Sequence, residues 1–140
     1  MGDRDDVVDI LSRLALFADL ARHQLEAVAH TFEEEAFSEG QRVLRQGFSG
    51  NNFYVILEGE ASVRVDGSDL ATLGRGDFFG EVTALLGDEP TADVVALRDM
   101  RCLVLGGPEV EGFLVTHPRV MFRMLQAEAR RLRATIQWRS

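Results

Sequence analysis

The chain has 140 residues, 46% of them hydrophobic and 27% charged, which is enough to bury one hydrophobic core but not two. Its formal net charge of -8 at pH 7 opposes nonspecific binding to nucleic acid and to anionic membranes, because a protein needs an excess of positive charge to be attracted to either of them. No apolar run approaches the roughly 18 residues that span a membrane, and the first residues lack the pattern of a secretory signal. We therefore expect a cytoplasmic protein with no membrane partner, in which the single cysteine, Cys102, is a buried thiol.

Apolar side chains recur at three- and four-residue spacing over residues 7–17 and again over 21–32, which predicts two amphipathic helices. Asp19 precedes the second pattern and is a candidate N-cap, because a carboxylate there can accept from the first backbone N–H groups. We expect the chain to open with N-terminal helices over residues 1–32.

After residue 32 the apolar period changes to two, the period of β-strands. Glycine-rich turns separate six short apolar runs, at 42–45, 53–57, 61–65, 70–73, 94–97 and 102–105. Many short strands joined by tight turns favour a β-sandwich or jelly roll. We predict a mainly β fold with flanking helices, in which residues 33–107 form a double-stranded β-helix (jelly roll) of about eight strands.

Two prolines predict the starts of the last helices, since proline suits the first helical position. We expect a short helix from Pro108 and a longer one from Pro118, together forming a C-terminal helical segment over 108–140. The longer helix carries an apolar seam of Met121, Leu125, Ala129, Leu132 and Ile136. An apolar stripe of this kind favours burial against another surface, so we predict a homodimer through this helix.

The last helix is basic, whereas the rest of the chain is acidic. From residue 118 onward the sequence has six arginines and one acidic residue, Glu128. We interpret the arginines at positions 130, 131, 133 and 139 as a solvated face beside the seam, with contacts to the acidic body or to a partner as the alternative.

A short helix predicted over residues 80–87 interrupts the strand pattern. Gly80 allows close approach of a ligand, and the backbone N–H groups of Val82, Thr83 and Ala84 at a helix start can hold a small anion. The Glu81 carboxylate can accept from a sugar hydroxyl, and the apolar strands offer a wall for a base. The alternative is a plain hairpin turn in which Glu81 only favours the helix dipole.

Catalytic patterns are absent from the sequence. The three histidines have no cysteine or carboxylate at metal-ligand spacing, and no serine lies in a Gly-x-Ser-x-Gly nucleophile elbow. We therefore predict a protein that is not an enzyme and that uses no metal and no cofactor.

Residues 47–60 and 76–81, taken with Phe17 and Gly40, resemble the cyclic nucleotide-binding domain family of catabolite activators and protein-kinase regulatory subunits. The resemblance runs from about residue 10 to 138 and implies one domain with a phosphate-binding cassette at 76–96. It implies that the glutamate holds the ribose 2'-hydroxyl, that the helix-start amides hold the cyclic phosphate, and that the long last helix moves over the base. The ligand-binding residues implied are Phe79, Gly80, Glu81, Val82, Thr83, Ala84, Pro90, Thr91 and Ala92.

The chain departs from the family where an arginine clamps the phosphate, in the pattern Arg-Ser/Thr-Ala-x-Val-x-Ala. Pro90 takes the place of that arginine, followed by Thr91 and Ala92, and proline has neither charge nor N–H. We therefore expect weak or no binding of ordinary cyclic AMP. Three alternatives stay open: Arg98 or Arg101 reaches in from the next strands, the pocket holds a nucleoside or another uncharged ligand, or the pocket is empty.

From these features we predict a regulatory or sensor domain that binds a nucleotide-like ligand. One alternative is a ligand-free interaction or dimerisation scaffold. Another is the sensor half of a Crp-type transcription regulator without its DNA-binding part, in which case this chain alone binds no nucleic acid.

Overall fold

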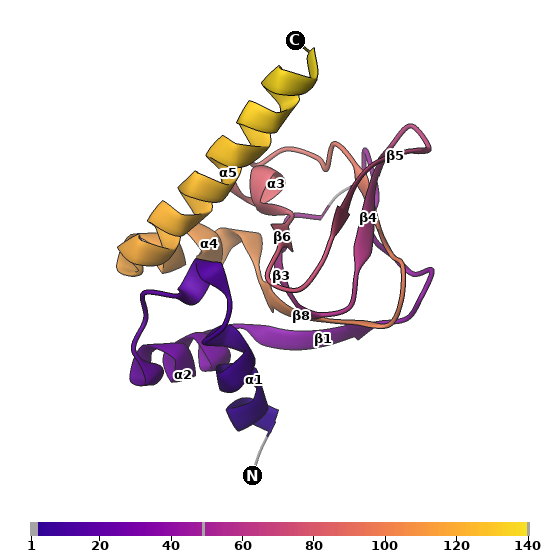
Figure 1. Ribbon diagram of the computed structural model, residues 1–140. Coiled ribbons are helices and arrows are strands. Elements are labelled where there is room, and N and C mark those ends of the chain that lie inside the picture. The colour runs from indigo at the N-terminus through magenta and orange to yellow at the C-terminus, as the bar shows by residue number, and fades with distance from the viewer. Residues whose placement is uncertain (1–2, 49, 140) are drawn as a thin grey trace.

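The computed structural model describes residues 3–48 and 50–139 (Figure 1). Two four-stranded antiparallel sheets form the roll, with strand orders β1-β8-β3-β6 and β2-β7-β4-β5. The strands are β1 (Glu33–Phe37), β2 (Arg42–Leu44), β3 (Phe53–Glu58), β4 (Ala61–Val65), β5 (Ser68–Leu73), β6 (Phe78–Phe79), β7 (Asp93–Ala96) and β8 (Met100–Leu105). This architecture confirms the predicted jelly roll of eight strands with flanking helices.

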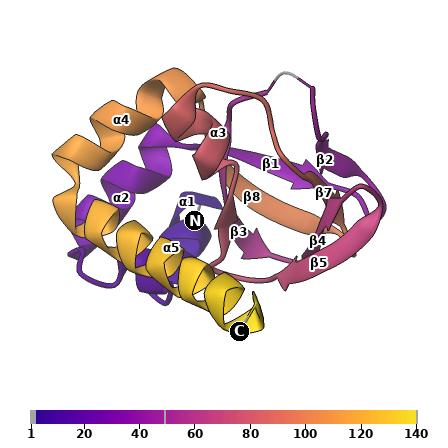
Figure 2. The ribbon, with the colours of Figure 1, turned by 90° about the horizontal axis from the view of Figure 1, so that it is seen from above.

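The helices gather at one end of the roll and leave the strands at the other, as the view from above shows (Figure 2). They are α1 (Asp3–Leu11), the 3-10 turn η1 (Ala15–Phe17), α2 (Arg22–Thr31), α3 (Glu81–Leu86), α4 (Gly107–Thr116) and α5 (Pro118–Arg139). The helix predicted over 7–17 is in fact α1 followed by η1. The short helix α3 and the two helices that begin near the prolines, α4 and the long α5, form as predicted.

Strand β3 contributes side chains to two hydrophobic clusters, one inside the roll and one between the sheet and the helices. Tyr54 and Ile56 point into the roll, whereas Phe53, Val55 and Leu57 belong to the cluster formed with the helices. A strand that is buried on both faces has a continuous apolar run rather than an alternating one, which is what this segment shows. The sheet that carries β3 therefore separates the roll interior from the helical layer.

Asp19 has a different role from the one predicted. The N-cap of α2 is Ala21, whose N–H donates to the Gln24 side chain, so the prediction of Asp19 as the cap is wrong. The Asp19 carboxylate instead accepts from Arg123 at 2.9 Å and from Arg119 at 3.2 Å. Hydrogen bonds from Arg123 and Arg119 lower the pKa of Asp19 to about 2. This cluster connects the segment before α2 to the first turns of α5.

Cys102 lies fully buried in β8, and burial raises the pKa of its thiol to about 12. The thiol is therefore protonated and unreactive at neutral pH, as expected from its apolar neighbours.

None of the helices in residues 3–48 and 50–139 is both long and apolar enough to cross a bilayer.

Candidate ligand-binding site

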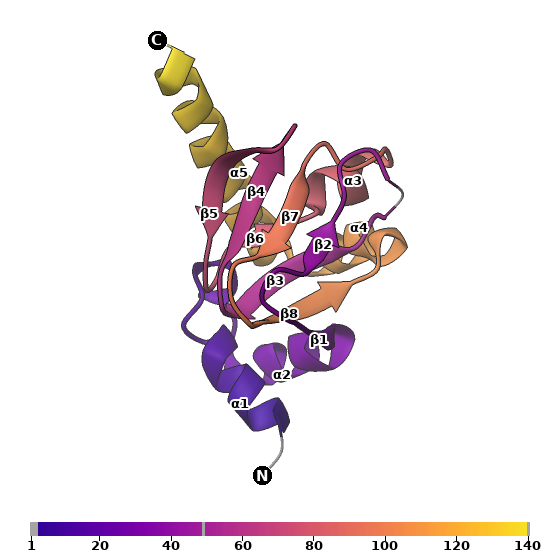
Figure 3. The same ribbon diagram turned by 90° about the vertical axis from the view of Figure 1, so that its right-hand side faces the viewer.

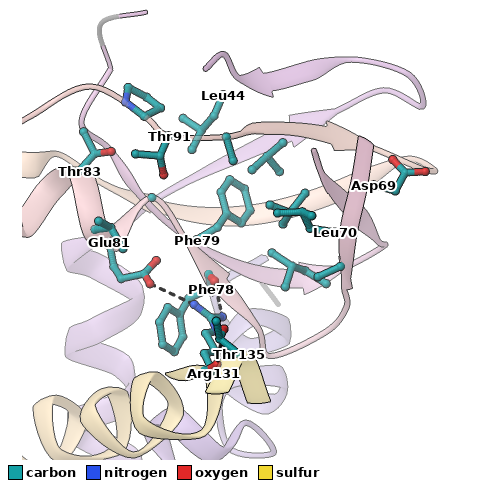
Figure 4. Close-up of a pocket in the computed structure, with 18 of the residues that line it drawn as sticks. Leu44, Asp69, Leu70, Phe78, Phe79, Glu81, Thr83, Thr91, Arg131 and Thr135 are labelled. Atoms are coloured by element: carbon teal, nitrogen blue, oxygen red, sulfur yellow. Dashed lines mark hydrogen bonds and ion pairs between the residues drawn. The ribbon is translucent and has the colours of Figure 1, made fainter. Parts of the chain in front are cut away.

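A cavity of about 820 Å³ opens between the β2-β7-β4-β5 sheet, α3 and the second half of α5 (Figure 4). The roll supplies an apolar wall of Leu44, Val63, Leu70, Leu73, Phe79 and Val94. All of the predicted site residues except Ala84 line this cavity. Such a volume with an apolar wall and a few polar groups is typical of a small-molecule site.

The turn from β6 into α3 depends on Gly80. Its φ of 84° lies in the left-handed region, and a Cβ at this position would collide with the backbone oxygen of Asn52. Glycine is therefore required here both for its conformation and for the lack of a side chain. The turn places Glu81 and Thr83, both buried, at the cavity.

Ala84 lies away from the cavity, against the helical core. Its N–H donates to the Gly80 oxygen at 3.1 Å, so this amide is already used within the turn. Val82 and Thr83, by contrast, are among the residues that line the cavity. Because α3 has only six residues, its dipole adds little to the attraction of an anion.

The expected phosphate side is formed by Pro90, Thr91 and Ala92. Pro90 is buried, and its carbonyl oxygen accepts from the N–H of Gly47 at 2.9 Å, which fixes the loop against the segment after β2. Next along the chain, the Asp93 carboxylate accepts from the backbone N–H of Gln46 at 2.7 Å. The side chains at this edge thus offer a hydroxyl and a carboxylate, and Arg42 of β2, which is not among the residues that line the cavity, lies 3.9 Å from that carboxylate.

Neither arginine of the following strands reaches the cavity. Arg98 donates to Glu60 at 2.7 Å. Arg101 donates to Glu34 at 2.7 Å and to Glu58 at 3.1 Å, and it also pairs with Asp6 of α1. Both guanidinium groups are thus held in ion pairs with residues that do not line the cavity, so the alternative that they replace the missing phosphate clamp is not supported.

One arginine does line the cavity, and it belongs to the group of α5 arginines predicted to form a solvated face. Arg131 of α5 donates through Nη1 to Glu81 at 3.0 Å and to Glu128 at 3.2 Å, and through Nη2 to the Phe78 oxygen at 2.8 Å. Its guanidinium carbon also lies 4.4 Å from the centre of the Phe78 ring. The solvated-face interpretation is therefore wrong for Arg131.

A spacing signal for Arg131 exists in the sequence. Val120, Met124 and Ala127 pack toward the core at steps of four and three, and position 131 continues that stripe by another step of four. The predicted seam lies on a different side of the helix. Its members Leu125 and Leu132 are each 62% exposed.

Glu81 has an unusual electrostatic environment. The pKa of this carboxyl group is raised to about 8, chiefly by burial and also by the nearby Glu128 carboxylate, while Arg131 acts in the opposite direction. The direction follows because a carboxylate removed from water loses hydration that one shared guanidinium replaces only in part. Among the described residues that line the cavity, the ionisable ones are Asp69, Glu81 and Arg131.

Solved structures with this fold come from several classes of regulator. The catabolite activator protein of Thermus thermophilus is 28% identical over 88% of this chain and 60% of its own, with a TM-score of 0.79. The N-terminal domain of a transcriptional regulator from Streptomyces coelicolor A3(2) is 31% identical over 92% of this chain and 93% of its own, with a TM-score of 0.67.

A third similar structure is the regulatory subunit of a cAMP-independent protein kinase A from Trypanosoma cruzi, bound to guanosine. It is 24% identical over 84% of this chain and 42% of its own, with a TM-score of 0.70, and this likeness concerns the fold alone. The chain thus spans about half the length of several of the proteins that it matches. The sequence profile of the cyclic nucleotide-binding domain matches residues 34–117, which is more than half of the chain. The chain therefore belongs to the cyclic nucleotide-binding domain family.

Proposed function

We propose that this chain is a non-enzymatic sensor domain whose cavity binds the base and sugar of a nucleotide-like ligand but holds a cyclic phosphate poorly. The observation that carries the proposal is the buried Pro90 at the position of the family's phosphate-clamping arginine. Among the described residues that line the cavity the one cation is Arg131, which is bound to Glu81, and Arg42 nearby is paired with Asp93. The predicted ligand residues Phe79, Gly80 and Glu81 keep their places in this proposal.

The missing clamp has a large expected effect on affinity. Removing one partner of a desolvated ion pair costs about 2–5 kcal/mol, which is roughly 30- to 5000-fold in binding. Thr91 retains a hydroxyl that can donate to a phosphate oxygen, but one neutral donor does not replace a bidentate guanidinium. Asp93 adds negative charge close by. Cyclic AMP should therefore bind at best at about millimolar concentration.

An uncharged nucleoside suits the cavity better than a cyclic nucleotide does. The Trypanosoma cruzi relative is described as cAMP-independent and is bound to guanosine, a ligand without phosphate. In the present chain the apolar wall can take a base, and Glu81 can accept from the sugar hydroxyls. Guanosine and adenosine are therefore the first ligands to test.

Restoring the clamp tests the proposal by calorimetry. Pro90→Arg should tighten cyclic AMP binding, because the loop keeps the carbonyl that binds Gly47 and gains a cation beside the phosphate site. Asp93 will oppose part of this gain, so the double variant with Asp93→Thr should bind more tightly still. Pro108→Arg is the matched control, since Pro108 is exposed at the start of α4, outside this cavity.

The Pro90→Arg change should leave guanosine and adenosine affinities almost unchanged, since neither carries a phosphate. Micromolar binding of cyclic AMP by the wild-type protein would show that another group already does the work of the clamp. If neither variant gains affinity for cyclic AMP and no nucleoside binds, the ligand-free scaffold is the better description.

We also propose that the domain is part of a cytoplasmic homodimeric regulator that pairs through α5. The exposed seam of this helix supports the homodimer, because a stripe of large apolar side chains in water favours association. The Streptomyces coelicolor relative, of which the chain covers 93%, is an N-terminal domain of a transcriptional regulator. This comparison supports the proposal that the chain is the sensor half of such a regulator and itself makes no contact with nucleic acid.

A further inference from the structure

A groove lies between α3 and the start of α4, and it is separate from the ligand cavity. It has a volume of about 380 Å³ and is lined by Ala84, Leu85, Gly107, Pro108 and Glu111. None of these five residues lines the ligand cavity. Figures 2 and 3 show α3 beside α4 at the end of the roll where the helices gather. The groove is therefore a surface for which the proposed function has no use.

Apolar side chains remain in water at this groove. Leu85 is 50% exposed and Leu86 is 71% exposed, although α3 has only six residues. Pro108 adds a third exposed apolar side chain at the start of α4. Single exposed apolar residues are common in proteins, but several of them around one groove are typical of an interaction site.

The rim of the groove is acidic. Four exposed carboxylates come from the loop after α3 and from the first turns of α4, namely Asp88, Glu89, Glu109 and Glu111. The two segments supply no cation to balance them, because the sequence has no arginine or lysine over 76–97 or over 102–118. Within the described part of the chain, none of the four is in an ion pair. The rim thus attracts a positively charged partner.

The apolar seam of α5 has the opposite electrostatic setting. Arg130 and Arg133 are exposed on the same helix, and the segment from residue 118 onward has six arginines and one acidic residue. Two exposed apolar surfaces of one small molecule therefore differ in the charge around them. Charge of opposite sign selects different partners for the two surfaces, because a wrong pairing brings like charges together.

We propose that the groove between α3 and α4 docks an amphipathic helix of a separate protein, whose apolar side chains pack on Leu85 and Leu86 and whose arginines or lysines lie over the acidic rim. In this mode of recognition the apolar anchors supply affinity and the charges supply specificity. The basic α5 of a second copy is the less favoured occupant, since such a head-to-tail contact keeps adding chains unless it closes a ring. The inference does not depend on which ligand the cavity binds.

The test uses two synthetic peptides of about four helical turns with leucines at three- and four-residue spacing. Arginines flank the leucines in one peptide, and glutamates replace every arginine in the other. Methyl NMR spectra of the wild-type protein should show the arginine peptide at Leu85 and Leu86, and the glutamate peptide should leave both signals unchanged. High salt should weaken the binding of the arginine peptide, since the carboxylates of the rim are exposed.

Two variants test the apolar and the acidic part of the groove separately. Leu86→Ser should weaken binding of the arginine peptide about tenfold, because one apolar contact is lost. Leu70→Ser is its matched control, since Leu70 is 66% exposed on β5, and it should bind like the wild type. Glu111→Gln should weaken binding several-fold at low salt, whereas Glu26→Gln, at an exposed acid on α2, should not. All four side chains are exposed, so the variants should unfold at the temperature of the wild type.

Several results would overturn the inference. These are equal affinity for the two peptides, an arginine-peptide footprint outside the groove, wild-type affinity in Leu86→Ser, and no binding at about millimolar peptide. If Leu86→Ser lowers the mass of the protein in sedimentation, the groove is a contact between copies of this chain and the separate partner is wrong. None of these results concerns nucleoside binding in the cavity, so the proposed function is tested independently.

Discussion

At the scale of single residues, the cavity depends on a turn that accepts only glycine. Two glycines flank α3, Gly80 at its start and Gly87 at its end, and both have φ values in the left-handed region, 84° and 78°. They differ in their surroundings, because a Cβ at Gly80 would collide with the backbone of Asn52 while a Cβ at Gly87 would meet no atom within 4 Å. Alanine substitutions at these two glycines therefore separate the free-energy cost of the left-handed conformation from the free-energy cost of close packing.

Gly87→Ala should lower the free energy of unfolding by about 1–2 kcal/mol, the cost of a left-handed residue with a side chain. Gly80→Ala should lower it by more, since the Asn52 backbone has to move as well. Urea denaturation of both variants measures the difference. Equal losses for the two variants would mean that the backbone beside Gly80 yields easily and that the site is less rigid than described.

The raised pKa of Glu81 predicts a pH dependence of stability. In the unfolded chain this carboxyl group loses its proton near pH 4.5, whereas in the folded protein burial and the Glu128 carboxylate raise its pKa to about 8. The folded state therefore binds more protons across this window, so the contribution of Glu81 to stability is present at pH 4.5 and is lost as the pH rises toward 8. Urea denaturation at several pH values should show this fall in the wild type and a smaller one in Glu81→Gln.

Glu26→Gln is the control for the pH experiment, since Glu26 is an exposed acid on α2. It should leave the slope of unfolding free energy against pH as it is in the wild type. A Glu81→Gln protein with the wild-type slope would show that the Arg131 ion pair keeps Glu81 charged throughout this range.

At the scale of elements, α5 separates two tasks by helical face. One face holds Met124 and Ala127 in the core and Arg131 at the cavity, and the other exposes the seam that includes Leu132. Figures 1 and 3 show the end of this helix extending beyond the roll. The seam is thus available to a second copy of the chain without any change in the core.

Leu132→Asp should convert a dimer into a monomer in sedimentation experiments at about 100 micromolar protein, because a charge in an apolar seam is costly to bury. The thermal stability of the monomer should change little, since Leu132 is 62% exposed. Val115→Asp is the control, an equally exposed apolar position on α4 outside the seam, and it should leave the mass unchanged. A wild-type monomer at this concentration would contradict dimerisation through α5.

The strands and helices could be predicted from the sequence where burial of one face gives a regular spacing of apolar residues. Elements without such a spacing could not be predicted. Strand β1 begins with three glutamates that are all exposed, and it is a strand because it pairs with β8 rather than because it buries a face. Strand β6 has two residues, too few for any period. Both were missing from the six predicted runs, although the total of about eight was correct.

The candidate site could be predicted in part, for a similar reason. The local motif at residues 76–96 contains Gly80, Glu81 and Thr91. The sequence therefore predicts that these residues lie together at the cavity. Arg131 lies fifty positions beyond Glu81, and an arginine on a helix is normally read as solvent-facing. Only the packing of α5 over the turn after β6 reveals that this cation meets the buried acid.

At the scale of the whole molecule, the cavity, α5 and the seam form one connected arrangement. The cavity lies between the roll and α5, and the proposed dimer surface lies on another face of that helix. In the proposed function the domain binds an uncharged ligand in this cavity without any chemical conversion of that ligand.

The most direct test of the central claim compares adenosine with cyclic AMP by calorimetry on the wild-type protein. The two ligands share base and sugar ring and differ by the cyclic phosphate, which also ties up the 3'-hydroxyl, so the ratio of their dissociation constants measures what the phosphate site contributes. Because Pro90 brings no cation to that site, we expect adenosine to bind at least as tightly as cyclic AMP. Cyclic AMP binding roughly 30-fold tighter than adenosine or more, the effect of a working ion pair, would contradict it.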